Sequence, residues 1–155
     1  MRALIQRVRS ARVRVGEETV GEIGPGLLTF LGVGQQDSSK EVQWLIRKVL
    51  SLRIFEDDSG KMNRSLVDIQ GEHLIVSQFT LYGDCSQGNR PGFSAAARPE
   101  RAQPLYDEAI QMSRAAGVRT QTGRFQAEMH VELTNDGPVT FFLETPQESP
   151  TKEMG

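Results

Sequence analysis

Apolar and polar residues alternate along much of the first third of the chain, at the two-residue period of a strand with one buried face. Between residues 11 and 15, for example, small apolar residues alternate with Arg12 and Arg14, which we expect to face outward. Turns containing glycine follow at residues 16–18 and 24–26. The pattern predicts four strands, the last of them apolar throughout and buried on both faces. They cover residues 3–8, 11–15, 19–23 and 27–33.

Apolar positions at the helical period predict two helices. A capping box precedes the first, in which the Ser38 hydroxyl and the Glu41 carboxylate satisfy free backbone amides reciprocally. Pro99 suits the first turn of the second helix and Gly117 its end, while Pro104 predicts a bend or a later start. The expected buried stripes are Val42, Leu45, Ile46, Val49 and Leu50 in the first helix and Leu105, Ala109, Met112 and Ala116 in the second.

The last third of the chain predicts further strands. Apolar residues alternate strictly with polar ones between Phe125 and Leu133, the clearest half-buried strand in the sequence. The segment Asn135–Pro138 is expected to turn the chain back into a strand at Val139–Leu143, and a short strand is expected at residues 52–55. The fold class is therefore α/β, with mostly antiparallel β-sheets layered together and helices on the outer face.

The central part of the chain combines an apolar strand with polar residues at its end. Leu74 to Val76 is an apolar run that suits a strand buried on both faces. It passes without a turn signal into Ser77, Gln78 and Thr80, whose polar groups cost free energy unless each finds a partner. Two explanations remain open from composition alone: a strand that ends at the wetted edge of the protein, or a functional site. The polar loop that follows, at residues 83–93, stands where loops often contact ligands.

Length and charge narrow the class of protein. A chain of 155 residues favours one domain, and a net charge of −2 does not suit a protein that coats nucleic acid. We assign residues 1–144 to a single domain and residues 145–155 to a disordered tail. The first fourteen residues contain five arginines and no acid, which form either a solvated strand face or a small strip that contacts phosphates. No stretch approaches membrane-spanning length, so we expect a soluble, intracellular protein.

Several familiar catalytic arrangements do not occur in the sequence. The two histidines lack the spacing of a helical zinc site, and nothing resembles the nucleophile elbow of a serine hydrolase. The acidic loop at residues 57–60 is too short for a calcium loop, and the single Cys85 is more typical of an incidental thiol than of a nucleophile. Thr80 has no neighbouring base in the sequence. The chemistry that remains available is an oxyanion hole formed by the backbone amides of Phe79 and Thr80.

Two sextets carry a resemblance to a known family. Ser77–Tyr82 and Asn135–Thr140 resemble the two signature motifs of the D-aminoacyl-tRNA deacylases. Further matching segments occur in the same order, so that the resemblance runs from residue 6 to residue 140. They lie at residues 6–8, 24–28, 60–63, 88–91 and 122–125. A small departure is Gly92, where serine is expected in many relatives; it lies outside both motifs.

The resemblance implies a cytoplasmic homodimeric hydrolase that cleaves the ester between D-amino acids and tRNA without a metal or cofactor. Ser77, Gln78, Phe79 and Thr80 would surround the scissile ester. The 3′-terminal ribose hydroxyl of the tRNA would assist the attacking water, in place of a protein base. Such an enzyme would recycle tRNA and enforce homochirality.

The resemblance also assigns roles away from the first motif. Gly137–Pro138 would be cis and enter the partner subunit's site, where its carbonyls hold the α-amino group and exclude an L side chain; glycine mischarged on alanine tRNA would be accepted. Arg7 would brace that loop, and Phe125 and Met129 would line the terminal-adenine pocket, although their alternation alone favours the core. Two alternatives remain: a relative with Gly-Pro trans and altered amino-acid choice, and a non-catalytic module that binds the tRNA 3′ end.

Overall fold

Strand β1 (Arg2–Val15) is the centre of the sheet because it has antiparallel neighbours along both edges. The computed structural model describes residues 1–147. One edge of β1 pairs with β2 (Glu18–Ile23) and β3 (Gly26–Gly32), and the other pairs with β8 (His130–Glu144). Two separate strands were predicted for this segment; they form one strand because Arg9 and Ser10, which join them, bring no glycine or proline to break it.

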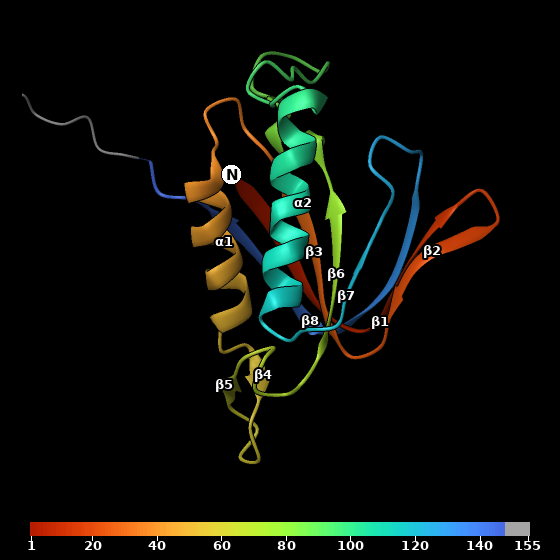
Figure 1. The fold of residues 1–155 in the computed structure, drawn as a ribbon, viewed down its shortest axis with the longest axis vertical. Helices are drawn as coiled ribbons and strands as arrows, with labels where there is room; N and C mark the ends of the chain where they lie inside the picture. The colour runs from red at the N-terminus through yellow and green to blue at the C-terminus, as the bar shows by residue number, and fades with distance from the viewer. Residues whose placement is uncertain (148–155) are drawn as a thin grey trace, which may run out of the picture.

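The sheet continues from β3 through two parallel neighbours, β6 (Glu72–Ser77) and β7 (Thr120–Thr122) (Figure 1). The six strands have the order β2-β1-β3-β6-β7, with β8 beside β1, so antiparallel pairs outnumber parallel ones as predicted. The sheet curls until β2 approaches β7. A Cβ atom at Gly21 would lie 2.3 Å from the Thr122 carbonyl oxygen, so only glycine permits this approach. The result is a nearly barrel-shaped sheet.

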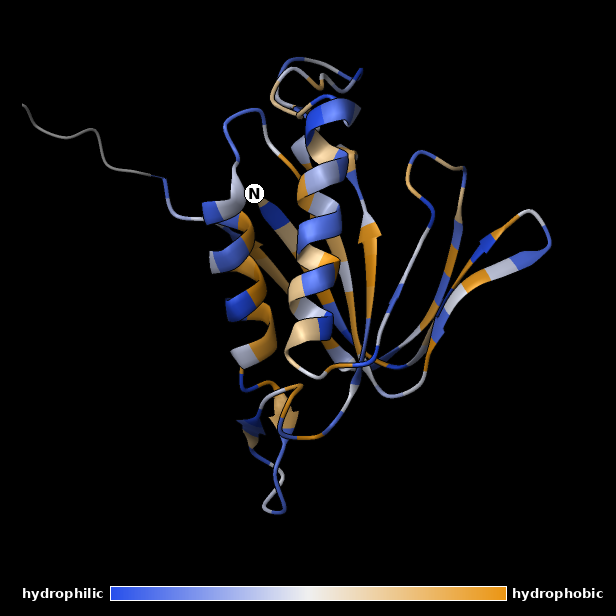
Figure 2. Cartoon of the chain, in the orientation of Figure 1, coloured by the Kyte–Doolittle hydropathy of each residue, from blue (hydrophilic) through white to orange (hydrophobic). Residues whose placement is uncertain are grey.

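Two helices lie side by side on one face of the sheet (Figure 1). Helix α1 (Ser39–Ser51) begins at the predicted capping box, in which the Ser38 amide donates to the Glu41 carboxylate at 2.7 Å. All of its predicted stripe residues are buried, and Figure 2 shows the hydrophobic side of α1 turned toward α2 and the sheet. Helix α2 (Pro99–Ala115) runs through Pro104 without a break, and Gly117 follows it at a φ of +83°.

The buried face of α2 differs from the predicted one. Tyr106 and Ser113 are buried because their hydroxyl groups bond to the sheet: Tyr106 donates to the Ile75 carbonyl at 2.7 Å, and Ser113 lies 2.9 Å from His73 Nδ1. The apolar pattern cannot reveal such polar anchors. The buried residues of α2 are Tyr106, Ala109, Ile110 and Ser113, whereas of the predicted stripe Leu105 and Met112 are only partly buried and Ala116 is exposed.

Each face of the sheet contributes to its own hydrophobic cluster. Consecutive residues alternate between them: Leu27 and Ile75 belong to the cluster under the helices, while Leu28 and Leu74 belong to the cluster on the other face. This explains why β3 and β6 read as continuous apolar runs, as predicted for strands buried on both sides.

A small hairpin of β4 (Phe55–Glu56) and β5 (Met62–Arg64) stands apart from the main sheet. The strand predicted at residues 52–55 is realised only at Phe55. In its acidic loop, the Asp57 carboxylate accepts hydrogen bonds from the backbone amides of Lys61 at 3.0 Å and Ser59 at 2.8 Å. These bonds hold the pKa of Asp57 below its ordinary value and make it a turn-forming residue.

Two predictions for the last third of the chain are wrong. Residues 125–129 form a turn rather than the start of a strand, and Gln126 adopts a φ of +62° there. The segment Asn135–Pro138 does not reverse the chain, because the residues on both sides of it pair with the same strand: Asn135 with Val8 and Thr140 with Gln6. Residues 136–139 instead bulge out of β8, opposite the single residue Arg7 of β1.

The chain ends described by the structure lie together. Thr145, the first residue of the predicted tail, is buried, and its amide donates to the Met1 carbonyl at 2.9 Å. Pro146 and Gln147 are exposed and belong to no helix or strand, and residues 148–155 of the predicted tail lie outside the described residues. Among residues 1–147, no helix is long and apolar enough to cross a membrane.

Candidate active site

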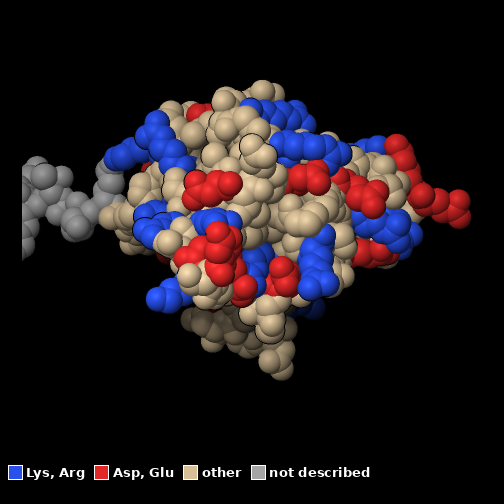
Figure 3. All heavy atoms as spheres, turned by 90° about the horizontal axis from the view of Figure 1, so that it is seen from below, with Lys and Arg blue, Asp and Glu red and all other residues tan. Residues whose placement is uncertain are grey.

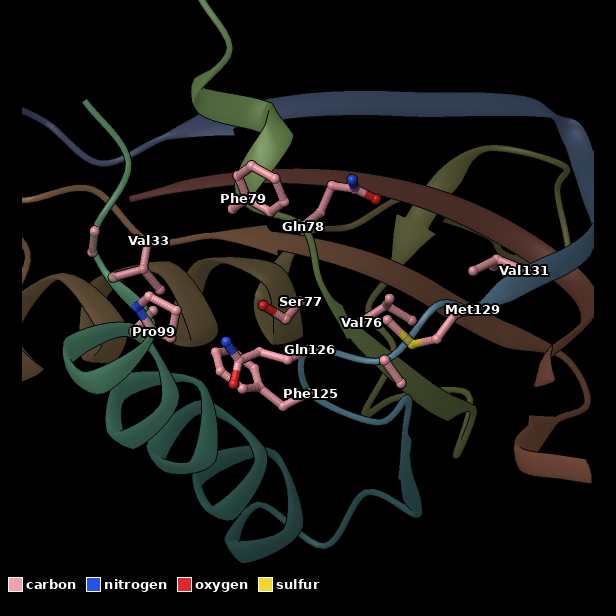
Figure 4. A pocket seen from close by; sticks show the side chains of 13 residues that line it. Val33, Val76, Ser77, Gln78, Phe79, Pro99, Phe125, Gln126, Met129 and Val131 are labelled. Carbon is pink, nitrogen blue, oxygen red and sulfur yellow. The ribbon is translucent and has the colours of Figure 1, made fainter. Parts of the chain in front are cut away.

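A cavity of about 550 Å³ opens where β6 ends, between the start of α2 and the turn at residues 125–129 (Figure 4). The residues around it share one property, namely that none carries a charged or titratable side chain. They are Val33, Val76, Ser77, Gln78, Phe79, Ala97, Pro99, Ala102, Phe125, Gln126, Ala127, Met129 and Val131. The site is therefore apolar, with a few hydroxyl and amide groups, which is typical of a small-molecule pocket.

The first wall of the cavity is the turn that follows β6. The Gln78 amide donates to the Leu31 carbonyl at 2.8 Å, and the chain then enters a short 3₁₀ helix, η1 (Phe79–Tyr82). The first amides of a helical turn, here those of Phe79 and Thr80, have no acceptor within the turn. Arg2 holds the far end of η1 by donating to the Leu81 carbonyl at 2.9 Å. The turn that carries the predicted oxyanion-hole donors is thus held at both ends, and its first residue, Phe79, lines the cavity.

Side chains of the first motif meet at the same place. In Figure 4, Ser77 lies in the middle of the labelled residues, with Phe79 on one side and Phe125 on the other. The side-chain amide of Gln78 donates from Nε2 to the Thr80 hydroxyl, so Thr80 contacts an amide rather than a base. Thr80 itself does not line the cavity. Among the described residues, no base makes a hydrogen bond to the Thr80 hydroxyl, which is the contact that would activate it as a nucleophile.

The opposite wall contains Phe125 and Met129. The Phe125 ring lies 5.9 Å from the ring of Tyr106 on α2, and it packs on the edge of the cluster beneath the helices. Met129 packs against the second cluster, and its sulfur accepts the Arg124 amide at 3.4 Å. Gly123 makes room for it, because a Cβ atom there would lie 2.7 Å from the Met129 sulfur. The core and pocket explanations of these residues are therefore compatible.

Sequence reasoning missed several residues of the cavity. Val33 and Ala97 belong to two segments joined by the hydrogen bond from the Ala97 amide to the Val33 carbonyl, 2.9 Å long. Pro99 and Ala102 come from the first turn of α2. The sequence marks Val33 only as the end of a buried strand and Pro99 only as a helix start, and nothing in it places either residue at a site. Gln126 could not be found because the turn that contains it was predicted as a strand.

Gly137–Pro138 does not line this cavity. The peptide bond between the two residues is cis, and both lie in the bulge of β8. β1 and β3 stand between β8 and β6 in the sheet, so strand spacing alone puts β8 roughly 14 Å from β6. Arg7 is buried beneath the bulge and donates from Nε to the Asp136 carbonyl at 2.9 Å. The second motif is thus held rigidly, but away from the cavity of its own chain.

The N-terminal arginines are largely paired with acids. Arg12 and Arg14 both contact Glu132 on β8, at 2.6 Å and 2.8 Å, and their hydrogen bonds hold the pKa of Glu132 below its ordinary value. Arg2 contacts Glu144 at 2.7 Å. Of the two explanations that the sequence left open, the structure favours a surface strand face with ion pairs. Figure 3 shows the same interspersion of basic and acidic side chains on the face it views.

His73 precedes the motif on β6 and is fully buried. Its two ring nitrogens lie 2.7 Å from the Thr29 hydroxyl and 2.9 Å from the Ser113 hydroxyl. Burial lowers the pKa of His73 to about 3, from an ordinary value of 6.5. His73 therefore joins β3, β6 and α2 as a neutral structural residue. Within residues 1–147, no three acidic, histidine or cysteine side chains gather as metal ligands would.

Known proteins share much of this sequence. Residues 4–144 match the family model described as D-Tyr-tRNA(Tyr) deacylase. A protein of Clostridioides difficile (strain 630) named D-aminoacyl-tRNA deacylase is 58% identical over 145 residues, which are 94% of this chain and 97% of that protein. One of the same name from Geotalea uraniireducens (strain Rf4) is 55% identical over 155 residues, covering 100% and 98%.

Two solved structures are also similar. One, titled c-Myc DNA Unwinding Element Binding Protein, is 43% identical with a TM-score of 0.88 and covers 95% of this chain and 100% of its own. The other, titled as a probable eukaryotic D-amino acid tRNA deacylase, has a TM-score of 0.79 over 92% of this chain and 97% of its own. At 19% identity, the second supports the fold alone.

Proposed function

The chain belongs to the D-Tyr-tRNA(Tyr) deacylase family, and from this premise we propose that it hydrolyses the ester bond of D-aminoacyl-tRNA in the cavity at the end of β6. The observation that carries the proposal is that η1 begins in the wall of that cavity: Phe79, its first residue, lines a pocket whose lining residues include no titratable side chain. Residues 1–144 would form the catalytic domain, acting in the cytoplasm, where aminoacyl-tRNA is used.

The proposed chemistry is electrostatic. Water adds to the ester carbonyl carbon, and the negative charge that develops on the carbonyl oxygen meets the amides of Phe79 and Thr80. The bond to the ribose oxygen then breaks, and that oxygen takes a proton as the tRNA leaves. A neighbouring ribose hydroxyl of the 3′-terminal adenosine orients the water, because no protein base lines the cavity.

The cavity fits the end of a tRNA. Phe125 and Met129 offer an aromatic face and a polarisable sulfur to the terminal adenine, while Ser77 and Gln78 stand on the side of the ester. A volume of about 550 Å³ is within the usual range for small-ligand pockets and accommodates an adenosine with its aminoacyl group.

We infer that the site is completed by a second copy of the chain. Gly137–Pro138 lies too far across the sheet to act in its own cavity, and β8 has no strand on its outer edge among the described residues. Phe141 and Phe142 on β8 are 40% and 54% exposed, which is unusual for a strand that faces water. A homodimer would cover this surface and bring the bulge of one chain to the cavity of the other.

In that arrangement, chirality is selected by exclusion. The backbone carbonyls of Gly137–Pro138 would hold the substrate's α-amino group and occupy the space that the first carbon of an L side chain needs. A D side chain would point into open space. Glycine has no side chain to exclude, so glycyl-tRNA, including glycine mischarged on alanine tRNA, would also be hydrolysed.

The test compares deacylation of D-alanyl, D-tyrosyl, glycyl and L-alanyl tRNA under the same conditions. We expect similar rates for the two D substrates, cleavage of the glycyl substrate, and refusal of L-alanyl tRNA. A single methyl group in an ordinary apolar pocket gives only about 10–200-fold discrimination, so a larger gap between the glycyl and L-alanyl substrates would indicate exclusion by rigid backbone. Comparable rates for L-alanyl and D-alanyl tRNA would refute the assignment, and failure to cleave any of the four would favour a non-catalytic binding module.

A further inference from the structure

Two aromatic side chains meet beside the cavity and remain exposed. The ring of Phe79, in the cavity wall, lies 5.2 Å from the ring of Phe93, with an angle of 62° between the ring planes. Phe79 is 56% exposed and Phe93 is 40% exposed. We call Phe79 and Phe93 the aromatic pair. Two exposed aromatic rings next to a binding cavity are suited to a second ligand contact.

The backbone on both sides of Phe93 is firmly held. Before it, Asp84 and Gly92 exchange two backbone hydrogen bonds of 2.7 Å and 2.9 Å, which close the loop at residues 84–92. After it, the Gln35 amide donates to the Ala95 carbonyl at 3.1 Å. The Phe93 ring is therefore presented to solvent by an ordered chain. A ligand that binds to it would not need to order this segment first.

The loop also carries positive charge, three residues before Phe93 in the sequence. Arg90 is exposed, and no carboxylate among residues 1–147 pairs with it. The one acid of the loop, Asp84, is already occupied by the amide and hydroxyl of Ser86 at 2.9 Å and 2.6 Å. Exposed aromatic rings and a loop arginine are elements with which proteins bind single-stranded nucleic acid, by stacking on bases and contacting phosphates.

We propose that Phe93, together with Phe79 and Arg90, forms a second nucleotide subsite for the nucleotide that precedes the terminal adenosine of the tRNA. The inference rests on the proposed function, which puts the terminal adenosine in the cavity. The base of the preceding nucleotide stacks on the aromatic pair, and Arg90 contacts a phosphate. The subsite extends recognition along the single-stranded 3′ end and lets the enzyme bind tRNA despite a net charge of −2.

The test uses three substrates with the same D-amino acid: its ester with adenosine, its ester with the dinucleotide cytidylyl-adenosine, and the full D-aminoacyl-tRNA. For the unaltered enzyme, kcat/KM should rise about fivefold or more from the adenosine ester to the dinucleotide ester, which is the lower range for stacking one base on an aromatic side chain. Phe93→Leu keeps an apolar side chain but cannot stack, and should abolish that rise while leaving the adenosine ester within about twofold. Phe93→Tyr, which can still stack on a base, should keep the rise in kcat/KM. Arg90→Gln should lower kcat/KM for tRNA and weaken its dependence on salt.

The outcomes separate the proposals. Equal losses on all three substrates for Phe93→Leu would mean that Phe93 only supports η1, and would overturn the subsite. No loss on any of them would overturn it as well. Equal losses accompanied by dissociation in sedimentation experiments would mean that a second copy of the chain covers Phe93, and would also overturn it. If the unaltered enzyme cleaves no D-aminoacyl ester, the proposed function itself fails, which is a different result.

Discussion

The buried guanidinium of Arg7 joins two distant parts of the backbone, because Nε donates to the Asp136 carbonyl at 2.9 Å and Nη1 donates to the Ile54 carbonyl at 2.8 Å. The first of these bonds fixes the residue immediately before Gly137–Pro138. The strand that carries the second motif is therefore anchored from beneath by a residue of the central strand, opposite the bulge.

Arg7→Met keeps the length of the side chain but removes both donors. Hydrogen bonds from charged groups contribute about 1.5–3 kcal/mol each, so we expect the free energy of unfolding to fall by roughly 3 kcal/mol. The rate of deacylation should fall as well, because the bulge loses its anchor. The matched control is Arg9→Met, since Arg9 also lies near Asp136 but is 77% exposed at its side chain. That change should alter stability by less than about 0.5 kcal/mol in urea unfolding. Equal losses in the two variants would contradict the role assigned to Arg7.

The amide of Phe79 can be removed separately from its ring. Gln78 has φ −141° and ψ 84°, which is outside the helical region that a following proline disfavours, so a proline at the next position, the first of η1, is sterically acceptable. Phe79→Ala removes the ring alone, whereas Phe79→Pro removes the ring and the amide hydrogen. If the amide stabilises the oxyanion, single-turnover deacylation by Phe79→Pro should be about 10²–10³-fold slower than by Phe79→Ala. Similar rates for the two variants would place the oxyanion hole elsewhere.

The Thr80 hydroxyl should be dispensable for covalent chemistry. It accepts a hydrogen bond from the Gln78 side chain and has no base beside it, so we expect Thr80→Ala to retain measurable deacylation and Thr80→Ser to act like the unaltered enzyme. Mass spectrometry of acid-quenched reactions should detect no aminoacyl adduct. An adduct on Thr80 that forms and decays at the rate of turnover would establish it as the nucleophile instead.

Local patterns predicted some elements completely and others only in part. The buried stripe of α1 follows from helical spacing and the capping box, which are properties of the segment itself. The bulge of β8 does not, because an Asn-Asp-Gly-Pro sequence suits a hairpin turn equally well. Tertiary structure selects the bulge over the turn, because β1 pairs with β8 on both sides of it. The Asn135 side chain closes the bulge by accepting a hydrogen bond from the Val139 amide at 2.7 Å.

The candidate site shows the same division. Ser77 to Thr80 could be found because polar groups at the end of a buried strand require an explanation and match a family motif. Val33 and Pro99, which complete the cavity, are ordinary core and helix-start residues in the sequence. Only the packing of α2 against the ends of β3 and β6 brings them to the site, and no local pattern contains that information.

The burial of His73 predicts how stability depends on pH. The unfolded chain takes up a proton below pH 6.5, whereas the folded protein does not protonate His73 until about pH 3. The contribution of this group is therefore complete above pH 6.5 and is lost as the pH falls. The free energy of unfolding should drop by about 2 kcal/mol between pH 6.5 and pH 5. Urea unfolding should show a smaller change for His73→Asn, which cannot titrate, and an equal change would contradict the assignment.

Gly137–Pro138 lies on β8, which β1 and β3 separate from β6 and the cavity, and this position predicts that catalysis needs two chains. A Phe79→Pro protomer has a defective cavity but an intact bulge, and a Pro138→Ala protomer has the reverse. If each cavity receives the bulge of the partner, a hybrid dimer has one site in which both parts are intact. Random reassociation of equal amounts makes half of the dimers hybrid, so about a quarter of the unaltered activity should return from two inactive proteins. Mixing either variant with the Phe79→Pro/Pro138→Ala double variant is the control and should restore nothing. If the bulge acted within its own chain, every protomer in the hybrid would still carry a defect, and no activity would return; a fully active monomer would exclude the shared site altogether.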